Sequence, residues 1–170
     1  MSLVSSFYRV RAAYSGEDDR PLAGYLASMG TYAGLVGLAA AVGRRRGARL
    51  PERFSLADTA LLAVATHKAS RLLTKSSIAS ALRAPFTRYE EPAGEAELNE
   101  SVRADNGVQH AVGELVTCPF CTGVWMAGGL TAGLVLAPRA TRLVITALTA
   151  VAGSDYLHLA YAAAKKHVAE

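Results

Sequence analysis

The sequence predicts an all-α integral membrane protein, a bundle of three or four helices with a basic amphipathic helix and a polar cytoplasmic loop. The first observation behind this prediction is composition: 51% of the 170 residues are hydrophobic and only 19% are charged, which is apolar for a soluble domain. The second is that apolar residues gather in long stretches at 21–43, 120–137 and 143–164, each long enough to cross a bilayer. The third is that lysine and arginine collect at the edges of those stretches, where membrane proteins carry them.

A chain of this length is expected to form one domain. Arg9 and Arg11 interrupt the short apolar patches near the N-terminus, so a signal peptide is not expected there. The net charge of +4 comes without a basic stripe interleaved with aromatics, so nucleic acid is not an expected partner. The predicted parts are an N-terminal arm at 1–20 and a single membrane domain at 21–170, with helices near 21–43, 55–75, 119–137 and 143–164 and a polar loop at 76–116.

The stretch at 21–43 holds 23 residues without a charge, enough to cross about 30 Å of hydrocarbon. It carries a GxxxG pattern at Gly30 and Gly34, and a second one lies at Gly129 and Gly133. Small residues at this spacing let helices approach closely in lipid, so they predict helix packing and a possible homo-oligomer. The alternative is that glycine is simply common in membrane helices.

The second helix follows five arginines between residues 44 and 53, and Ser55 with Asp58 resembles a capping box at its start. One face of this helix is basic, so it either spans the membrane or lies at the interface. The basic residues, together with one downstream arginine, are candidates for binding an anionic lipid headgroup or a phosphorylated ligand. The alternative is that they mark the cytoplasmic side and pair with downstream glutamates. The candidates are His67, Lys68, Arg71, Lys75 and Arg83.

Residues 76–116 contain prolines, glycines and a run of glutamates, so we expect a loop that is functional or partly disordered. A tight turn at APRATR, residues 137–142, separates the third helix from the fourth. In the fourth helix Asp155 and His158 share one face. Ionisable groups inside a membrane suggest a proton relay or a cation site, as in a small transporter or lipid-binding subunit. Alternatively, Asp155 bridges to a basic residue of the second helix.

Two topologies fit the charges. If the second helix lies flat, 13 of the 18 lysines and arginines fall on one side; if all four helices span, the split is 11 to 7. Basic residues favour the cytoplasm, and both topologies place the segment CPFC, residues 118–121, and the C-terminus there. We therefore expect a multi-pass protein of the cell membrane with reduced thiols facing the cytoplasm.

The segment CPFC admits three interpretations. Cys118 at the N-cap of the third helix and Cys121 one turn later could be the nucleophile and the resolving thiol of a thiol-disulfide oxidoreductase. They could instead bind zinc with His110 as third ligand, or through two chains related by a dyad. The third interpretation is structural, with two small residues opening a helix. For the zinc site within one chain, the fourth ligand would be Asp105, Glu114 or His67.

The segments SRLLT at 70–74, RAPF at 83–86 and CPFCTGVW at 118–125 resemble the bacterial family catalogued as domain of unknown function 1360. The resemblance covers roughly residues 55–164 and implies a small bacterial membrane protein without an established activity. It implies no catalytic residue. The leading hypothesis is a non-enzymatic scaffold or partner-binding protein. The oxidoreductase and the transporter or lipid-binding subunit are the alternatives.

Overall fold

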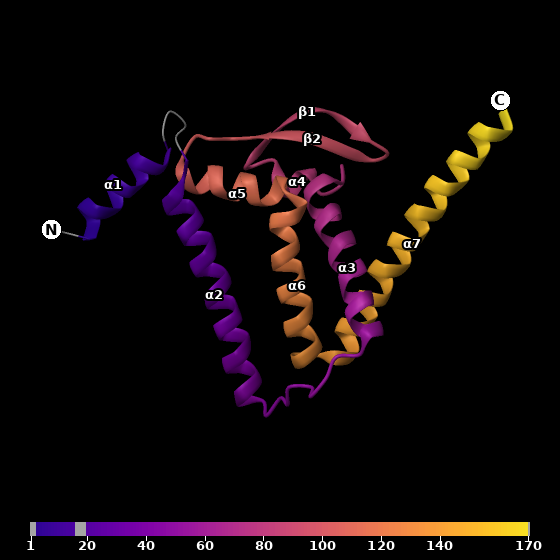
Figure 1. Cartoon of the computed structure of the whole chain (residues 1–170), viewed down its shortest axis with the longest axis horizontal. Coiled ribbons are helices and arrows are strands. Elements are labelled where there is room, and N and C mark those ends of the chain that lie inside the picture. The colour runs from indigo at the N-terminus through magenta and orange to yellow at the C-terminus, as the bar shows by residue number, and fades with distance from the viewer. Residues whose placement is uncertain (1–2, 16–19, 170) are drawn as a thin grey trace.

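The structure is a computed structural model that describes residues 3–15 and 20–169. Helices dominate the described residues, which confirms the all-α prediction, and a small two-stranded sheet accompanies them (Figure 1). Residues 1–2 and 16–19 of the predicted N-terminal arm lie outside the described part. The elements in chain order are α1 (Leu3–Ser15), α2 (Leu22–Arg45), α3 (Leu56–Lys75), α4 (Ser80–Arg83), β1 (Thr87–Gly94), β2 (Glu97–Val102), α5 (Gly107–Thr117), α6 (Pro119–Leu136) and α7 (Pro138–Ala169).

Three of the described helices, α2, α6 and α7, are long and apolar enough to cross a membrane. Their apolar side chains point outward to a large extent, as at Leu26, Met29 and Leu143, which are 56%, 67% and 71% exposed. A soluble monomer rarely exposes so much apolar surface, whereas lipid is a solvent for it. A helix also satisfies its own backbone hydrogen bonds, as a span in lipid requires.

Helix α3 lies within the bundle, because it packs against both α6 and α7. It begins at Ser55, whose side chain accepts a hydrogen bond from the Asp58 backbone N–H at 3.0 Å, as the capping pattern predicts. The small side chains of Ala65 and Ser70 are buried and allow this close packing. The connection at 44–55 therefore lies at the opposite end of the bundle from the sheet (Figure 1). This position of the connection is the one that the topology with four spanning helices expects, but α3 is not among the described helices that are long and apolar enough to cross a membrane. Whether α3 spans the bilayer stays a prediction.

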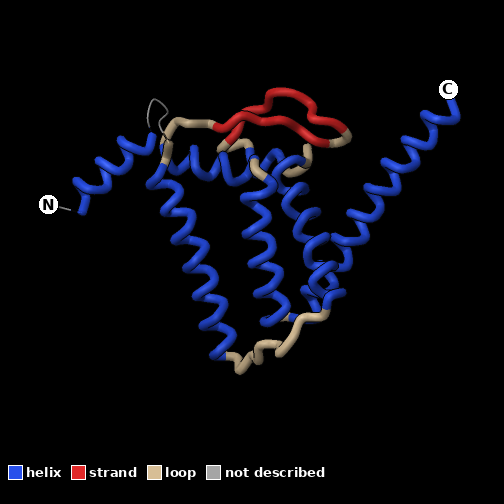
Figure 2. Tube along the Cα trace, in the orientation of Figure 1, coloured by secondary structure: helices blue, strands red, loops and turns tan. Residues whose placement is uncertain are grey.

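The segment expected as a polar loop is folded. Strands β1 and β2 form an antiparallel hairpin (Figure 2), with Thr87 opposite Val102 and Gly94 opposite Glu97. Two irregularities interrupt the pairing near Tyr89 and Pro92, so the strands lack the strict alternation that sequence analysis recognises. Pro92 is tolerated because β1 is an edge strand.

Helix α5 lies across one end of the bundle beneath the hairpin (Figure 1). It packs on α2 at Gly24, where an added Cβ would lie 2.6 Å from the Cβ of Ala111. It packs on the hairpin at Gly113, where an added Cβ would lie 2.5 Å from Val102 Cγ1 of β2. Only glycine permits both approaches. Residues 76–117, which comprise α4, the hairpin and α5, are called the polar cap below.

The predicted glycine patterns are used unequally. A Cβ added at Gly30, Gly34 or Gly129 would meet no atom within 4 Å, so these positions face open space in the single chain. Gly133 instead accommodates Thr141, whose Oγ1 would lie 2.6 Å from an added Cβ. Association of two chains through the open glycines stays a prediction.

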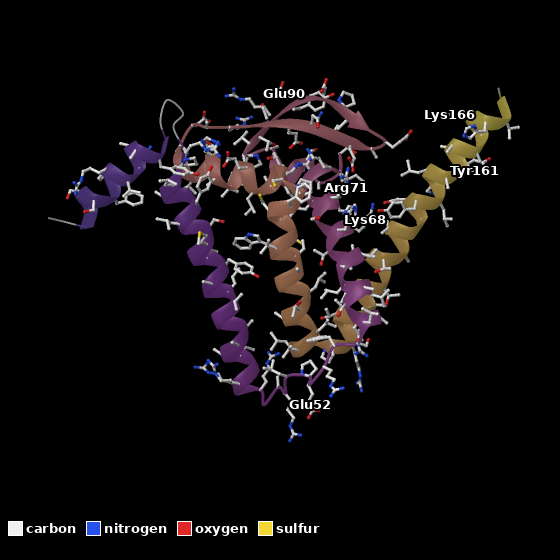
Figure 3. The ribbon with its side chains drawn as sticks, viewed as in Figure 1. Glu52, Lys68, Arg71, Glu90, Tyr161 and Lys166 are labelled. Atoms are coloured by element: carbon white, nitrogen blue, oxygen red, sulfur yellow. The ribbon has the colours of Figure 1, made fainter. Side chains whose placement is uncertain are left out.

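The last helix is longer than predicted. The sequence places a tight turn at 137–142 and a helix at 143–164, but α7 already begins at Pro138 and continues to Ala169. Proline is compatible with the first helical turn, because its missing N–H has no intrahelical partner there. The C-terminal half of α7 projects from the bundle (Figure 3), and Lys165 lies 5.8 Å from the centre of the Tyr161 ring.

Candidate functional site in the polar cap

The polar cap is built around a buried ion pair. Arg83 of α4 has a side chain with 0% exposure, and Glu100 of β2 has one with 5%. Two hydrogen bonds of 2.8 Å join the guanidinium to the carboxylate, one from Nε and one from Nη2. Arg83 Nη1 also donates to the carbonyl oxygens of Leu73 and Ser76, at 2.8 and 3.0 Å. One guanidinium thus joins the end of α3 to the hairpin.

The surroundings of Glu100 favour its charged form. Burial opposes ionisation, but hydrogen bonds from Arg83 and Thr87 outweigh this effect and lower the pKa of Glu100 below its ordinary value of 4.5. The Thr87 hydroxyl lies 2.9 Å from Glu100 Oε2 and 3.0 Å from the Arg83 carbonyl oxygen. Arg103 Nε donates to the Thr87 carbonyl oxygen at 2.8 Å. The charge pair is therefore enclosed by a local polar network.

The other residues of the predicted basic cluster are largely neutralised. Arg71 pairs with Glu97 of the hairpin, and Lys68 pairs with Asp155 of α7 (Figure 3). Together with Arg83, three of the five candidates for an anionic ligand already face a carboxylate of the same chain. The described residues provide no ion pair for His67 and Lys75, and an anion site at these two positions stays a prediction.

Asp155 and His158, the two ionisable residues predicted to act together in the last helix, have different surroundings in the structure. Asp155 contacts Lys68 of α3, which links the two helices in the way that the structural alternative describes. His158 lies three residues later and is exposed. A proton relay through both residues stays a prediction.

The two cysteines lie at a sharp junction between α5 and α6. Cys118 ends α5 and caps α6, and its Sγ accepts a hydrogen bond from the Cys121 backbone N–H at 3.2 Å. The buried Thr122 donates to the Leu115 carbonyl oxygen at 2.6 Å and fixes the angle between the helices. Cys118 is half-buried, Cys121 is exposed and both are free. The segment therefore has a local structural role, whatever chemistry its thiols perform.

His110 does not join the cysteines. Within residues 3–15 and 20–169, no three His, Cys, Asp or Glu side chains gather so that they could hold a metal ion. His110 Nε2 instead lies 3.4 Å from Glu114 Oε1. Glu114 also pairs with Arg20 at 3.1 Å and accepts a hydrogen bond from Tyr25. A zinc site shared by two chains stays a prediction.

The outer surface of the cap is open. An open depression of about 480 Å³ lies between α4 and the hairpin. Its apolar and aromatic lining comes from Ala81, Ala84, Tyr89 and Leu98, and its polar lining from Ser80, Thr87, Arg88, Glu100 and Arg103. Tyr89 is 60% exposed. Sequence analysis missed this feature and the cluster around Glu114, because both join residues from separate elements and neither leaves a local pattern.

Comparison with known proteins identifies the family. Residues 61–161 match the sequence pattern of a protein family that is described as a protein of unknown function, DUF1360. The chain belongs to this family. Sporulation protein YjcA of Bacillus subtilis (strain 168) is 35% identical over 96 residues, which cover 55% of this chain and 80% of that protein. No solved structure matches.

The region shared with DUF1360 proteins contains most of α3, the polar cap, α6 and much of α7. Arg83, Glu100 and both cysteines lie within it. Helix α2 and the arginine-rich connection after it lie outside the family match.

Removal of one member of the buried pair is expected to destabilise the cap strongly. Glu100→Ala leaves Arg83 buried without a counter-charge, which costs about 3–5 kcal/mol of unfolding free energy. Because folding lowers the pKa of Glu100, its stabilisation is complete above the ordinary value of 4.5 and is lost as the pH falls through the lowered value. Thermal unfolding of the detergent-solubilised protein at several pH values measures both effects.

Glu95→Ala is the matched control for this measurement, because Glu95 is exposed at the hairpin turn. It should leave the unfolding temperature and its acid dependence unchanged. If Glu100→Ala were as stable as this control, the buried pair would not hold the cap.

Substitution of Cys118 separates a structural role from a thiol-dependent one. Cys118→Ala removes the acceptor for the Cys121 N–H and is expected to cost about 1 kcal/mol, as loss of an N-cap does. Cys118→Ser keeps an acceptor in the same place and should retain the wild-type stability. Thermal unfolding checks this order, and equal damage by serine and alanine would show that the sulfur itself is required.

Proposed function

We propose that this DUF1360 protein is a multi-pass protein of the bacterial cell membrane that acts without enzymatic chemistry, as a scaffold that holds a partner protein at the polar cap. The observation that carries the proposal is the construction of the cap. Its inner side contains a buried ion pair whose arginine also donates to carbonyl oxygens at the end of α3, while β1 and the depression beside Tyr89 are open.

Firm attachment of the cap supports a binding role. Arg71 of α3 pairs with Glu97 of β2, Gln109 of α5 donates to the Pro85 carbonyl oxygen at 2.8 Å, and Glu114 ties α5 to α2 through Tyr25. Together with the bonds from Arg83 to the Leu73 and Ser76 carbonyl oxygens, these contacts hold the parts of the cap together and join the cap to α2 and α3. A surface held in this way loses little conformational entropy when a partner binds.

The outer side of the cap has features that a partner can recognise. Every residue of β1 except Thr87 is exposed, and β1 is an edge strand, so its outer backbone groups can pair with an added strand. Exposed glutamates at 90, 91 and 95 surround the turn. The proposed partner therefore offers an extended segment with basic residues and an apolar anchor for the depression beside Tyr89.

The proposal includes a sidedness and an assembly. The four-helix arrangement puts 11 of the 18 lysines and arginines at the end that carries the cap, CPFC and the C-terminus, and the excess of basic residues favours the cytoplasm for that end. Open positions at Gly30 and Gly34 support association with a second copy. The name of the B. subtilis relative refers to sporulation, and a role in that process is part of the proposal.

A crosslinker placed in the depression tests the scaffold. A photoreactive phenylalanine in place of Tyr89 is expected to give one defined protein adduct in cells, because the depression would contact the partner. The same group in place of Leu143, which is 71% exposed on α7, should give none.

A variant without both cysteines distinguishes the scaffold hypothesis from the oxidoreductase hypothesis. Cys118→Ser with Cys121→Ser should retain the Tyr89 adduct, because the scaffold does not use the thiols. Loss of the adduct in this folded variant would favour thiol-disulfide chemistry, and equal adducts at positions 89 and 143 would contradict a partner surface on the cap.

The native cysteines test the sidedness directly. Cys121 is exposed, so a membrane-impermeant maleimide is expected to label it only after the cells are permeabilised. The control is Glu52→Cys in a background without native cysteines, since Glu52 lies at the opposite end of the bundle (Figure 3). This variant should be labelled in intact cells, and the reverse pattern would place the cap outside.

A further inference from the structure

The end of the bundle opposite the cap carries a dense group of arginines. Five of them lie in the last turn of α2 and in the connection after it, and two more lie at the start of α7. The two segments are near one another, because a Cβ added at Gly43 would lie 3.5 Å from Leu136 Cδ2 at the end of α6. Residues 44–53, the arginine connection, contribute Arg44, Arg45, Arg46, Arg49 and Arg53, and the α7 start contributes Arg139 and Arg142.

These arginines differ from Arg71 and Arg83 in their partners. All seven are exposed. In the described part of the chain, the ion pair at this end is the one between Arg142 and Asp58, at 3.9 Å, and both of its side chains are accessible. The five arginines of the arginine connection have no ion pair with any described residue. Their guanidinium groups are free to bind an external anion.

Exposed apolar side chains lie among the arginines. Leu50 and Leu56 are 79% and 87% exposed, and Phe54 is 46% exposed. Inorganic phosphate has no apolar part that could pack against these side chains. A bilayer surface suits both kinds, because cations meet the headgroups while apolar side chains enter the boundary with the acyl chains.

The position in the fold agrees with this chemistry. The arginines begin where α2 stops and where α6 turns into α7, and these are the helices long and apolar enough to cross a membrane. Residues directly beyond the end of such a helix lie at the level of the lipid headgroups. Guanidinium groups match the phosphate diester there through paired hydrogen bonds.

We propose that the arginine connection, with the start of α7, binds anionic phospholipid headgroups in the leaflet at this end of the bundle. The anion site expected from the sequence at His67, Lys68, Arg71, Lys75 and Arg83 is largely neutralised within the chain, whereas this group retains its charge. The inference concerns a different surface from the proposed partner site and does not depend on which end faces the cytoplasm.

Native mass spectrometry of the full-length protein in detergent tests the inference, with phosphatidylglycerol and phosphatidylcholine as probes. We expect tighter binding of phosphatidylglycerol. Removal of three arginines, Arg44→Gln, Arg45→Gln and Arg46→Gln, should weaken it by about fivefold for each arginine that contacts a headgroup. Phosphatidylcholine binding should change little.

The matched control removes three exposed basic residues elsewhere, through Arg88→Gln, Lys165→Gln and Lys166→Gln. It should retain the phosphatidylglycerol affinity of the wild type. Equal affinity for the two lipids, or equal losses in the two triple variants, would overturn the inference. Circular dichroism and gel filtration confirm that both variants are folded, and Arg49→Gln with Arg53→Gln gives an independent second measurement with the same expected direction.

Competition with inorganic phosphate distinguishes a lipid-binding site from a site for a soluble phosphate compound. At millimolar concentration it should not displace phosphatidylglycerol, because it makes no contact with Leu50 or Phe54. Phe54→Ser should weaken lipid binding without a change in charge. Complete displacement by phosphate, together with no effect of Phe54→Ser, would assign the arginines to a soluble phosphate compound and overturn the lipid site.

Discussion

The buried pair of Arg83 and Glu100 is the constraint on which the polar cap depends. Removal of two charges from water is costly, and their attraction compensates only where every remaining polar atom finds a partner. Here Arg83 also donates to the carbonyl oxygens of Leu73 and Ser76, which are left without helical partners at the end of α3. The position of the hairpin, and through it the place of α5 across the bundle, follows from this arrangement.

The same residue type serves opposite purposes at the two ends of the molecule. Arg71 of α3 and Arg83 of the cap have their charge matched by glutamates of the hairpin, so they stabilise the fold. Arginines of the connection between α2 and α3 lack such partners among the described residues, and exposed apolar side chains accompany them. Charge alone does not distinguish a structural arginine from one that is free to bind a ligand. The difference is whether the fold places a carboxylate of the same chain next to the guanidinium group.

The cysteines illustrate why a motif does not establish a function. The spacing of Cys118 and Cys121 suits a redox pair, a metal site or a helix cap. The structure shows the capping bond and the position at the α5–α6 junction, and His110 turns toward Glu114 instead. Membership of a family without a known activity adds no role for the thiols.

Much of this protein could be predicted from sequence because lipid solubility and helix capping depend on neighbouring residues. The apolar stretches became α2, α6 and α7, and the caps at Ser55 and Cys118 form as expected. The hairpin escaped prediction because two irregularities and Pro92 disturb its alternation. From the sequence, a bridge from Asp155 to the second helix and pairing of the basic residues with downstream glutamates were only alternatives, because partners such as Lys68 and Asp155 are 87 residues apart. The hydrogen bond from Tyr25 to Glu114 joins residues 89 positions apart and left no pattern in the chain. Such partners are chosen by the way the helices pack in space, and that packing is also what neutralised the predicted anion site and left the arginines at the other end free.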